Sequence, residues 1–127
     1  MPIAPILLGE CASSQIAEII YPAWVCPETL LVISSDLYHY LPRAEALAAG
    51  MTIARAIERN NAALIGPETA CGYVALRGLM QLAVSSSYYW RTLAVGHSGQ
   101  RGGLVGENLV GYGAFLLVES PVHRVIN

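Results

Sequence analysis

Two short segments carry the side chains best suited to chemistry. The first runs from Ser34 to Tyr40 and contains Asp36 and His39, three residues apart. At that spacing the carboxylate can orient the imidazole, either for general-base catalysis or in the outer shell of a metal ion. The alternative is an Asp that closes a turn beside a surface His, and the pattern alone favours neither interpretation. Asp36 is the only Asp in the chain.

The second segment is centred on Cys71. If Thr69 caps the helix that follows, Cys71 falls in the first helical turn, where the backbone N–H groups and the helix dipole favour a thiolate. A thiolate is both a nucleophile and a soft metal ligand. The alternative is a small buried hydrophobe, which is what a lone Cys more often is.

A third segment, Gly96 to Gln100, comes close to the nucleophile elbow of serine hydrolases. That elbow needs glycine where Gln100 stands, and a helix must follow it, whereas Arg101 and the two glycines after it start a helix poorly. We therefore reject a serine hydrolase.

Composition excludes several classes of function. The net charge is −2 and the seven basic residues, all Arg, are scattered, which argues against nucleic-acid binding. The absence of Lys removes Schiff-base chemistry. Three Cys without CxxC spacing are typical of reduced thiols in a cytoplasmic protein. No run reaches the roughly 18 apolar residues of a membrane span, so we expect no membrane association.

Hydrophobic patterns predict the elements that must position these residues. We expect strands at 3–8, 29–34, 90–96 and 109–119, and helices at about 14–21, 42–59 and from 69 onward. The continuous β-branched run 29–34 is typical of a strand buried on both faces. The order predicts an α/β fold, with α+β as the alternative: a mixed sheet of about four strands with packed helices. We expect one domain over 1–120 and a loose tail over 121–127.

The chain is unusually apolar for its size. Hydrophobic residues make up 54% of it and charged residues 13%. Either a sheet covered on both faces or a broad interface with another chain or domain would bury that surplus, and we expect both.

Several segments, taken in order, resemble one known family. They span nearly the whole chain: Pro5–Gly9, Ile33–Pro42, Thr52-Ile53, Ala70–Tyr73, Ser98-Gly99 and Val110–Phe115. In this order they are similar to the C-terminal half of the Memo family (mediator of cell motility). The resemblance implies half of a domain with the fold of class III extradiol dioxygenases, in which a non-haem metal sits at the strand ends.

The resemblance also implies roles for particular residues. Cys71 stands where a family metal ligand lies, and Asp36 and His39 line the same pocket, so Asp36, His39 and Cys71 are the expected catalytic residues. The expected metal is iron, with copper as the alternative, held by Cys71 and His39. His97 is unusual at its place in the family pattern and could serve as a further ligand.

Family members are about twice this length, and their N-terminal half supplies two His ligands that this chain lacks. The resemblance therefore implies a metal or redox pocket completed by a separate N-terminal-half subunit or by a second copy, and an isolated chain can be metal-free. Two alternatives stay open: a non-catalytic scaffold that binds a small molecule or peptide, and a truncated, inactive half-domain. Whether the chain is an enzyme is left open too.

Overall fold

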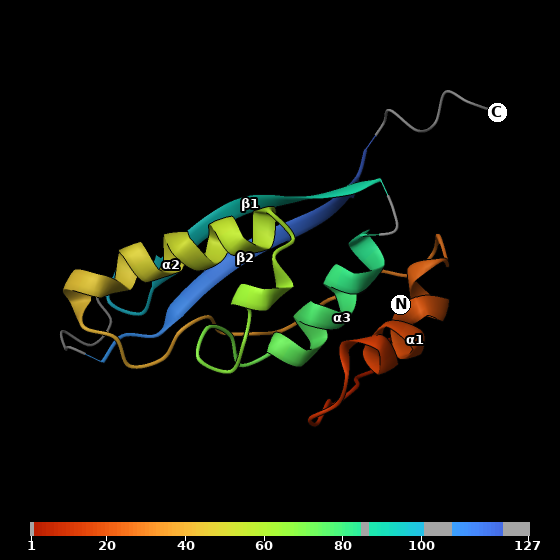
Figure 1. The fold of residues 1–127 in the computed structure, drawn as a ribbon, viewed down its shortest axis with the longest axis horizontal. Coiled ribbons are helices and arrows are strands. Elements are labelled where there is room, and N and C mark those ends of the chain that lie inside the picture. The colour runs from red at the N-terminus through yellow and green to blue at the C-terminus, as the bar shows by residue number, and fades with distance from the viewer. Residues whose placement is uncertain (1, 85–86, 101–107, 121–127) are drawn as a thin grey trace.

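A computed structural model describes residues 2–84, 87–100 and 108–120. Its elements are α1 (Ser13–Trp24), α2 (Arg43–Glu58), the 3-10 helix η1 (Ala62–Leu64), α3 (Tyr73–Val84), β1 (Tyr88–His97) and β2 (Gly111–Glu119). Figure 1 shows α2 running along the β1–β2 ribbon, with α3 and α1 grouped beside it. The expected tail over 121–127 lies outside the described residues.

The sheet formed by the described residues has two antiparallel strands. Their register pairs Trp90 with Leu117 and Gly96 with Tyr112, with a shift between Thr92 and Ala94. An isolated antiparallel bridge joins Leu41 to Leu109, just before β2 begins. The prediction of mixed helix and sheet is confirmed, and so are the two strands near 90–96 and 109–119. The expected sheet of about four strands is not what the described residues form.

The two missing strands are the apolar segments 3–8 and 29–34. Both lie outside any helix or strand. The prediction that 29–34 is buried on both faces is wrong, since Leu30 is 76% exposed and Val32 78% exposed. An apolar, β-branched run favours extended backbone, but a strand also needs a hydrogen-bonded neighbour, and none is in place along 29–34.

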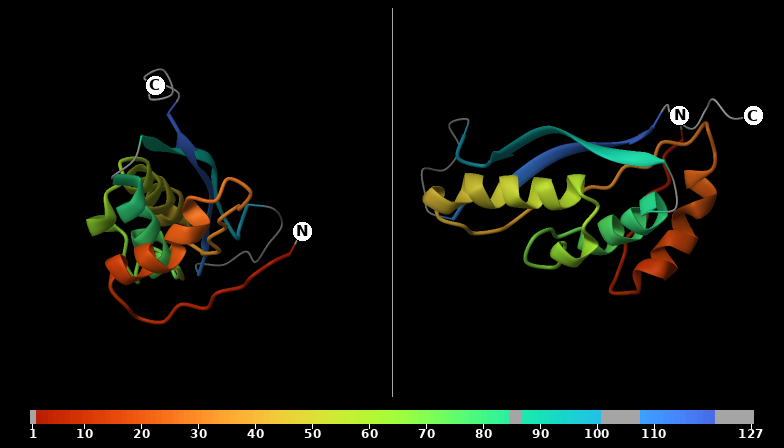
Figure 2. Two further views of the ribbon diagram at one scale, coloured as in Figure 1. Left: turned by 90° about the vertical axis from the view of Figure 1, so that its right-hand side faces the viewer. Right: turned by 45° about the horizontal axis from the view of Figure 1, so that its top comes forward.

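The helices lie mainly to one side of the sheet. The end-on view in Figure 2 places α2 and α3 on the same side of β1 and β2. Ile57 and Ile65, both fully buried, belong to the core that these elements share. The opposite face of the sheet leaves large apolar side chains such as Leu93 and Leu116 about half exposed.

Helical periodicity predicted the core side of α3 correctly. Leu76, Leu79, Met80 and Ala83 are all buried, as the i, i+3, i+4, i+7 spacing indicates. The same helical spacing predicts that Leu47 in α2 and Ile19 in α1 face the core, and this prediction is wrong, since both are about half exposed. Neither side chain belongs to the core cluster or to the partly buried residues packed against it.

Close contact between α1 and α3 depends on Gly78. A Cβ at this position would fall within 2.6 Å of Ile16 Cβ, an atom too near the backbone to rotate away. Gly78→Ala would gain about 1 kcal/mol of helix propensity, but overpacking typically costs about 1–3 kcal/mol. Because the overlap with Ile16 is severe, we expect a cost at the upper end of this range and a net loss of about 2 kcal/mol in the free energy of unfolding, measured by urea denaturation. A variant as stable as the native chain would show that α1 can move away from α3 freely.

Candidate metal centre

Backbone contacts bring the two predicted segments together. The Asp36 N–H donates to Cys71 Sγ at 3.2 Å, and the Cys71 N–H donates to the Asp36 carbonyl, also at 3.2 Å. On the other side, the Leu37 N–H donates to the Gly111 carbonyl at 2.8 Å. The segment that carries Asp36 and His39 is thus fixed between the start of β2 and the residues that precede α3.

Ser35 and Gly72 complete this junction, and sequence reasoning did not assign either of them a role. Ser35 Oγ accepts the Gly72 N–H at 2.8 Å and donates to the Asp36 carbonyl at 2.7 Å. Ser35 Oγ also lies 3.7 Å from Cys71 Sγ. A Cβ on Gly72 would fall 2.8 Å from Ser35 Cβ, so the close approach needs glycine. The sequence indicated a role for Ser35 and Gly72 only through their positions, since Ser35 adjoins Asp36 and Gly72 adjoins Cys71.

Cys71 does not lie in the first turn of a helix, and that prediction is wrong. Helix α3 begins at Tyr73, two residues later. Thr69 does not cap it, because the Thr69 hydroxyl accepts the Gly66 N–H at 2.8 Å within the preceding turn. The hydrogen bonds that reach Cys71 therefore come from Asp36 and Ser35, which are remote in sequence.

The side chains of Asp36, His39 and Cys71 converge. One ligand atom from each lies within 4.8 Å of the other two. His39 Nε2 is 3.5 Å from Asp36 Oδ2, and these side chains are 40% and 48% exposed, respectively. Donors bound to one metal ion at about 2.0–2.3 Å lie about 3.5 Å apart, so small side-chain rotations would suffice. A carboxylate, an imidazole and a thiolate suit a first-row transition metal and leave coordination positions open.

The backbone at Tyr40 has an unusual conformation and adjoins the group formed by Asp36, His39 and Cys71. Tyr40 has φ 59°, in the left-handed region that a bulky side chain rarely adopts. It separates His39 from Leu41, whose N–H donates to the Leu109 carbonyl at 3.1 Å. The sharp change of direction lets His39 stay beside Asp36 while the next residue bridges to the chain before β2.

His97 lies apart from this group of three. It ends β1, and its Nδ1 accepts the Gly99 N–H at 3.2 Å. The His97 N–H donates to Gln100 Oε1, also at 3.2 Å. The turn over 97–100 therefore occupies one ring nitrogen of His97, and the group of donor atoms within reach of one ion does not include this residue.

Two tyrosines near the group have raised pKa values. The Tyr73 hydroxyl donates to Glu10 Oε1 at 3.1 Å, and this hydrogen bond, together with partial burial, raises the pKa of Tyr73. Burial raises the pKa of Tyr38, whose hydroxyl oxygen has no hydrogen-bond partner within the described ranges. Both phenols therefore stay protonated at neutral pH.

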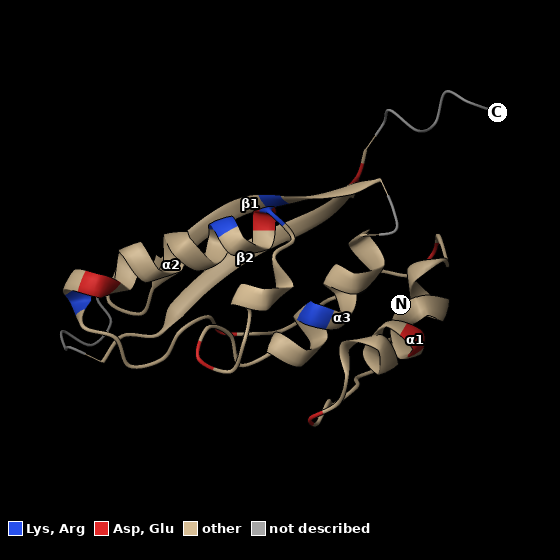
Figure 3. Ribbon diagram, viewed as in Figure 1, with Lys and Arg blue, Asp and Glu red and all other residues tan. Residues whose placement is uncertain are grey.

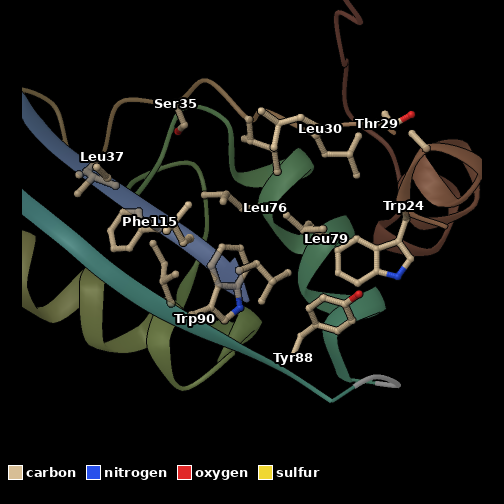
Figure 4. Close-up of a pocket in the computed structure, with 18 residues that line it drawn as sticks. Trp24, Thr29, Leu30, Ser35, Leu37, Leu76, Leu79, Tyr88, Trp90 and Phe115 are labelled. Carbon is tan, nitrogen blue, oxygen red and sulfur yellow. The ribbon is translucent and has the colours of Figure 1, made fainter. Parts of the chain in front are cut away.

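Two hollows flank the group. A cavity of about 400 Å³ is lined by Tyr38, His39 and Thr69 among others. A second cavity, of about 420 Å³, lies between residues 29–37, β2 and α3, and Ser35 forms part of its wall. Figure 4 shows Leu37, Leu76 and Phe115 among the side chains that line the second cavity. The first cavity is lined by His39 of the group, whereas the second comes near the group through Ser35.

Comparison with known proteins adds no family to this description. No protein-family model matches the chain, and a search of curated proteins finds no match. Over residues 2–84, 87–100 and 108–120, no helix is long and apolar enough to cross a membrane. The case for function therefore depends on the geometry of Asp36, His39 and Cys71.

Proposed function

We propose that the chain is a Memo-like protein with a non-haem metal pocket at the ends of its extended segments, completed by a partner chain. The observation that carries the proposal is the convergence of Asp36, His39 and Cys71 within 4.8 Å. These residues come from two segments more than thirty positions apart, joined by hydrogen bonds in both directions between residues 36 and 71. The proposed metal is iron, with copper as the alternative.

Each residue of the group has a distinct role in this proposal. Cys71 and His39 bind the ion, and the Asp36 N–H complements the negative charge of a metal-bound sulfur. The Asp36 carboxylate either binds the ion as well or orients the His39 ring from 3.5 Å. Bound iron or copper would supply redox or Lewis-acid chemistry. A substrate would then find a base in the Asp36 carboxylate, if this group does not bind the ion.

Exposure of the group supports completion by another chain. His39 and Asp36 keep 40% and 48% of their side-chain surface in water, and no charged residue is buried in the described part of the chain. A surface site of three ligands binds metal weakly and excludes solvent poorly. A second copy or a separate N-terminal-half subunit would add ligands and cover the site.

Metal content tests the proposal directly. The chain, purified anaerobically, is loaded with Fe(II) and, in parallel, with Co(II), whose sulfur-to-metal absorption reports thiolate ligation. We expect close to one ion per site, with the Co(II)–thiolate band, and loss of both in Cys71→Ala. The matched control is Cys26→Ala, which removes another exposed cysteine outside the group. Equal metal content in native protein and Cys71→Ala would end the proposal.

The second candidate function is binding without turnover. The cavity of about 420 Å³ favours it, since that volume lies in the range of small-molecule pockets. Its walls are mainly apolar, including Trp24, Trp90 and Phe115. A chain that takes up no metal but binds an environment-sensitive apolar dye, lost when Phe115 is changed to Asp, would favour this function over the first.

A further inference from the structure

Strand β2 leaves one edge unpaired beside the apolar cavity of about 420 Å³, which we term the wedge. Hydrogen bonds join residues 37–41 to residues 109–111. Farther along, no backbone hydrogen bond links residues 29–36 to residues 112–118, although all of these residues are described. Unpaired strand edges favour the addition of another strand.

The wedge is lined for an apolar occupant. Its walls come from segment 29–37, from both strands and from the helices, and enclose about 420 Å³. Figure 4 shows Leu30, Leu76, Leu79 and Phe115 turned toward this space, with the hydroxyl of Ser35 at its margin. No Asp, Glu, Lys or Arg lines it. Figure 3 likewise shows β2 without a charged residue until its last position.

The N-terminal segment 3–8, termed the arm, has the complementary character. It contains no charged residue. Ile3 is 85% exposed and Leu7 100% exposed, and no hydrogen bond joins residues 2–8 to any other described residue. Figure 2 shows it running along the outside of the molecule as extended chain. Apolar side chains left in water at this density favour burial against a partner.

The length and the hydrogen-bonding capacity of the arm also match the unpaired edge of β2. Six extended residues span about 20 Å, the length of the unpaired stretch 112–117. Pro5 lacks an N–H, but alternate residues of a strand face the same neighbour. The N–H groups of Ala4, Ile6 and Leu8 can therefore face β2, while Pro5 faces away from it. Ile6 and Leu8 then share one face of the added strand.

The surface area of the chain is large enough to include an interface between two copies. Its accessible area is 8925 Å², whereas a compact monomer of its mass exposes about 6,600 Å². The excess, part of which belongs to the arm itself, is larger than the roughly 800 Å² that each partner buries in a standard interface. Two copies can bury these apolar surfaces against each other, because each copy has both an arm and a wedge.

We propose that the arm of a second copy adds to β2 as a strand and fills the wedge, and that the exchange is reciprocal in a two-fold dimer. Main-chain hydrogen bonds to β2 and burial of Ile6 and Leu8 stabilise the dimer. The inference rests on these apolar surfaces and is independent of the proposed metal centre.

Ile6→Asp tests the arm without disturbing the fold, because Ile6 is 61% exposed in the single chain and is buried in the proposed dimer. The measurement is sedimentation equilibrium with a chelator present, so that metal plays no part. We expect a native dimer and self-association at least about tenfold weaker in Ile6→Asp. The control is Leu47→Asp, a change to the same residue at an exposed apolar position of α2. A native monomer, an undisturbed Ile6→Asp dimer, or dissociation of the control instead would overturn the proposal.

Cross-linking distinguishes a second copy from the chain's own arm. Chains carrying Leu7→Cys and differently tagged chains carrying Leu116→Cys, both otherwise cysteine-free, are mixed and treated with a bifunctional maleimide. We expect a linked product containing both tags. If a chain carrying both changes links only within itself on dilution, the arm folds back onto its own wedge and the exchange is wrong. No link of either kind would also overturn the proposal.

Discussion

His39→Ala is expected to weaken metal binding by about 100-fold, because it removes one of the three converging donors; even residues that only orient a ligand contribute about 10- to 100-fold. His39 Nε2 lies 3.5 Å from Asp36 Oδ2 and belongs to the group that spans 4.8 Å with Cys71 Sγ. The fold should tolerate the change, since His39 is exposed and its ring is not part of the core. Competition with a chromophoric chelator, using Co(II) or Zn(II), measures the affinity.

His97→Ala is the matched control for this prediction. Nδ1 of His97 is engaged by the Gly99 N–H, and the residue lies outside the group. We expect its loss to leave the affinity within about twofold of the native value, the scale of a few tenths of a kcal/mol for a remote substitution. A large loss in His97→Ala with little in His39→Ala would exchange the roles of the two histidines and refute the geometry described above.

Asp36→Asn then separates the two roles left open for the carboxylate. If Asp36 binds the ion, the amide should weaken binding as much as His39→Ala does. If Asp36 only orients His39, Asn can still hydrogen-bond to the ring, and the loss should be much smaller. The Asp36 N–H bond to Cys71 Sγ is unaffected by either outcome, because it belongs to the backbone.

Gly111→Ala is expected to produce the largest loss of stability, about 2–3 kcal/mol. A Cβ at Gly111 would occupy the space of the Tyr38 ring, with Cδ1 only 2.6 Å away. Tyr38 is buried and its ring has little room to move, because Gly50 also approaches it. Chemical denaturation followed by circular dichroism measures the free energy of unfolding.

Metal binding should fall together with stability in Gly111→Ala. The Gly111 carbonyl accepts the Leu37 N–H at 2.8 Å, and its N–H donates to the Tyr38 carbonyl at 2.9 Å, so this contact fixes the segment between Asp36 and His39. The control is Gly9→Ala, where a Cβ would meet nothing within 4 Å. If Gly111→Ala were as stable as Gly9→Ala, the approach of β2 to Tyr38 would not position the group.

The proposed dimer and the proposed metal centre lie close to each other. Ser35 lines the wedge and also lies 3.7 Å from Cys71 Sγ. A strand added beside β2 would therefore contact the segment that carries Asp36. Should both proposals hold, removal of the arm is expected to lower metal affinity as well as self-association.

The sequence by itself determined the elements that rest on local pattern. Periodicity placed the buried side of α3 and identified β1 and β2, because neighbouring residues alone set which side chains share a face. The candidate residues Asp36, His39 and Cys71 were also chosen from their types and spacing.

Only the tertiary structure decided whether those residues meet. The contact between residues 36 and 71 uses backbone groups and the hydroxyl of Ser35, none of which leaves a periodic signal in the sequence. The same limit explains the error over 29–34. Apolar, β-branched side chains favour extended chain, but pairing into a sheet requires a neighbour, and a neighbour is a property of the whole arrangement in space.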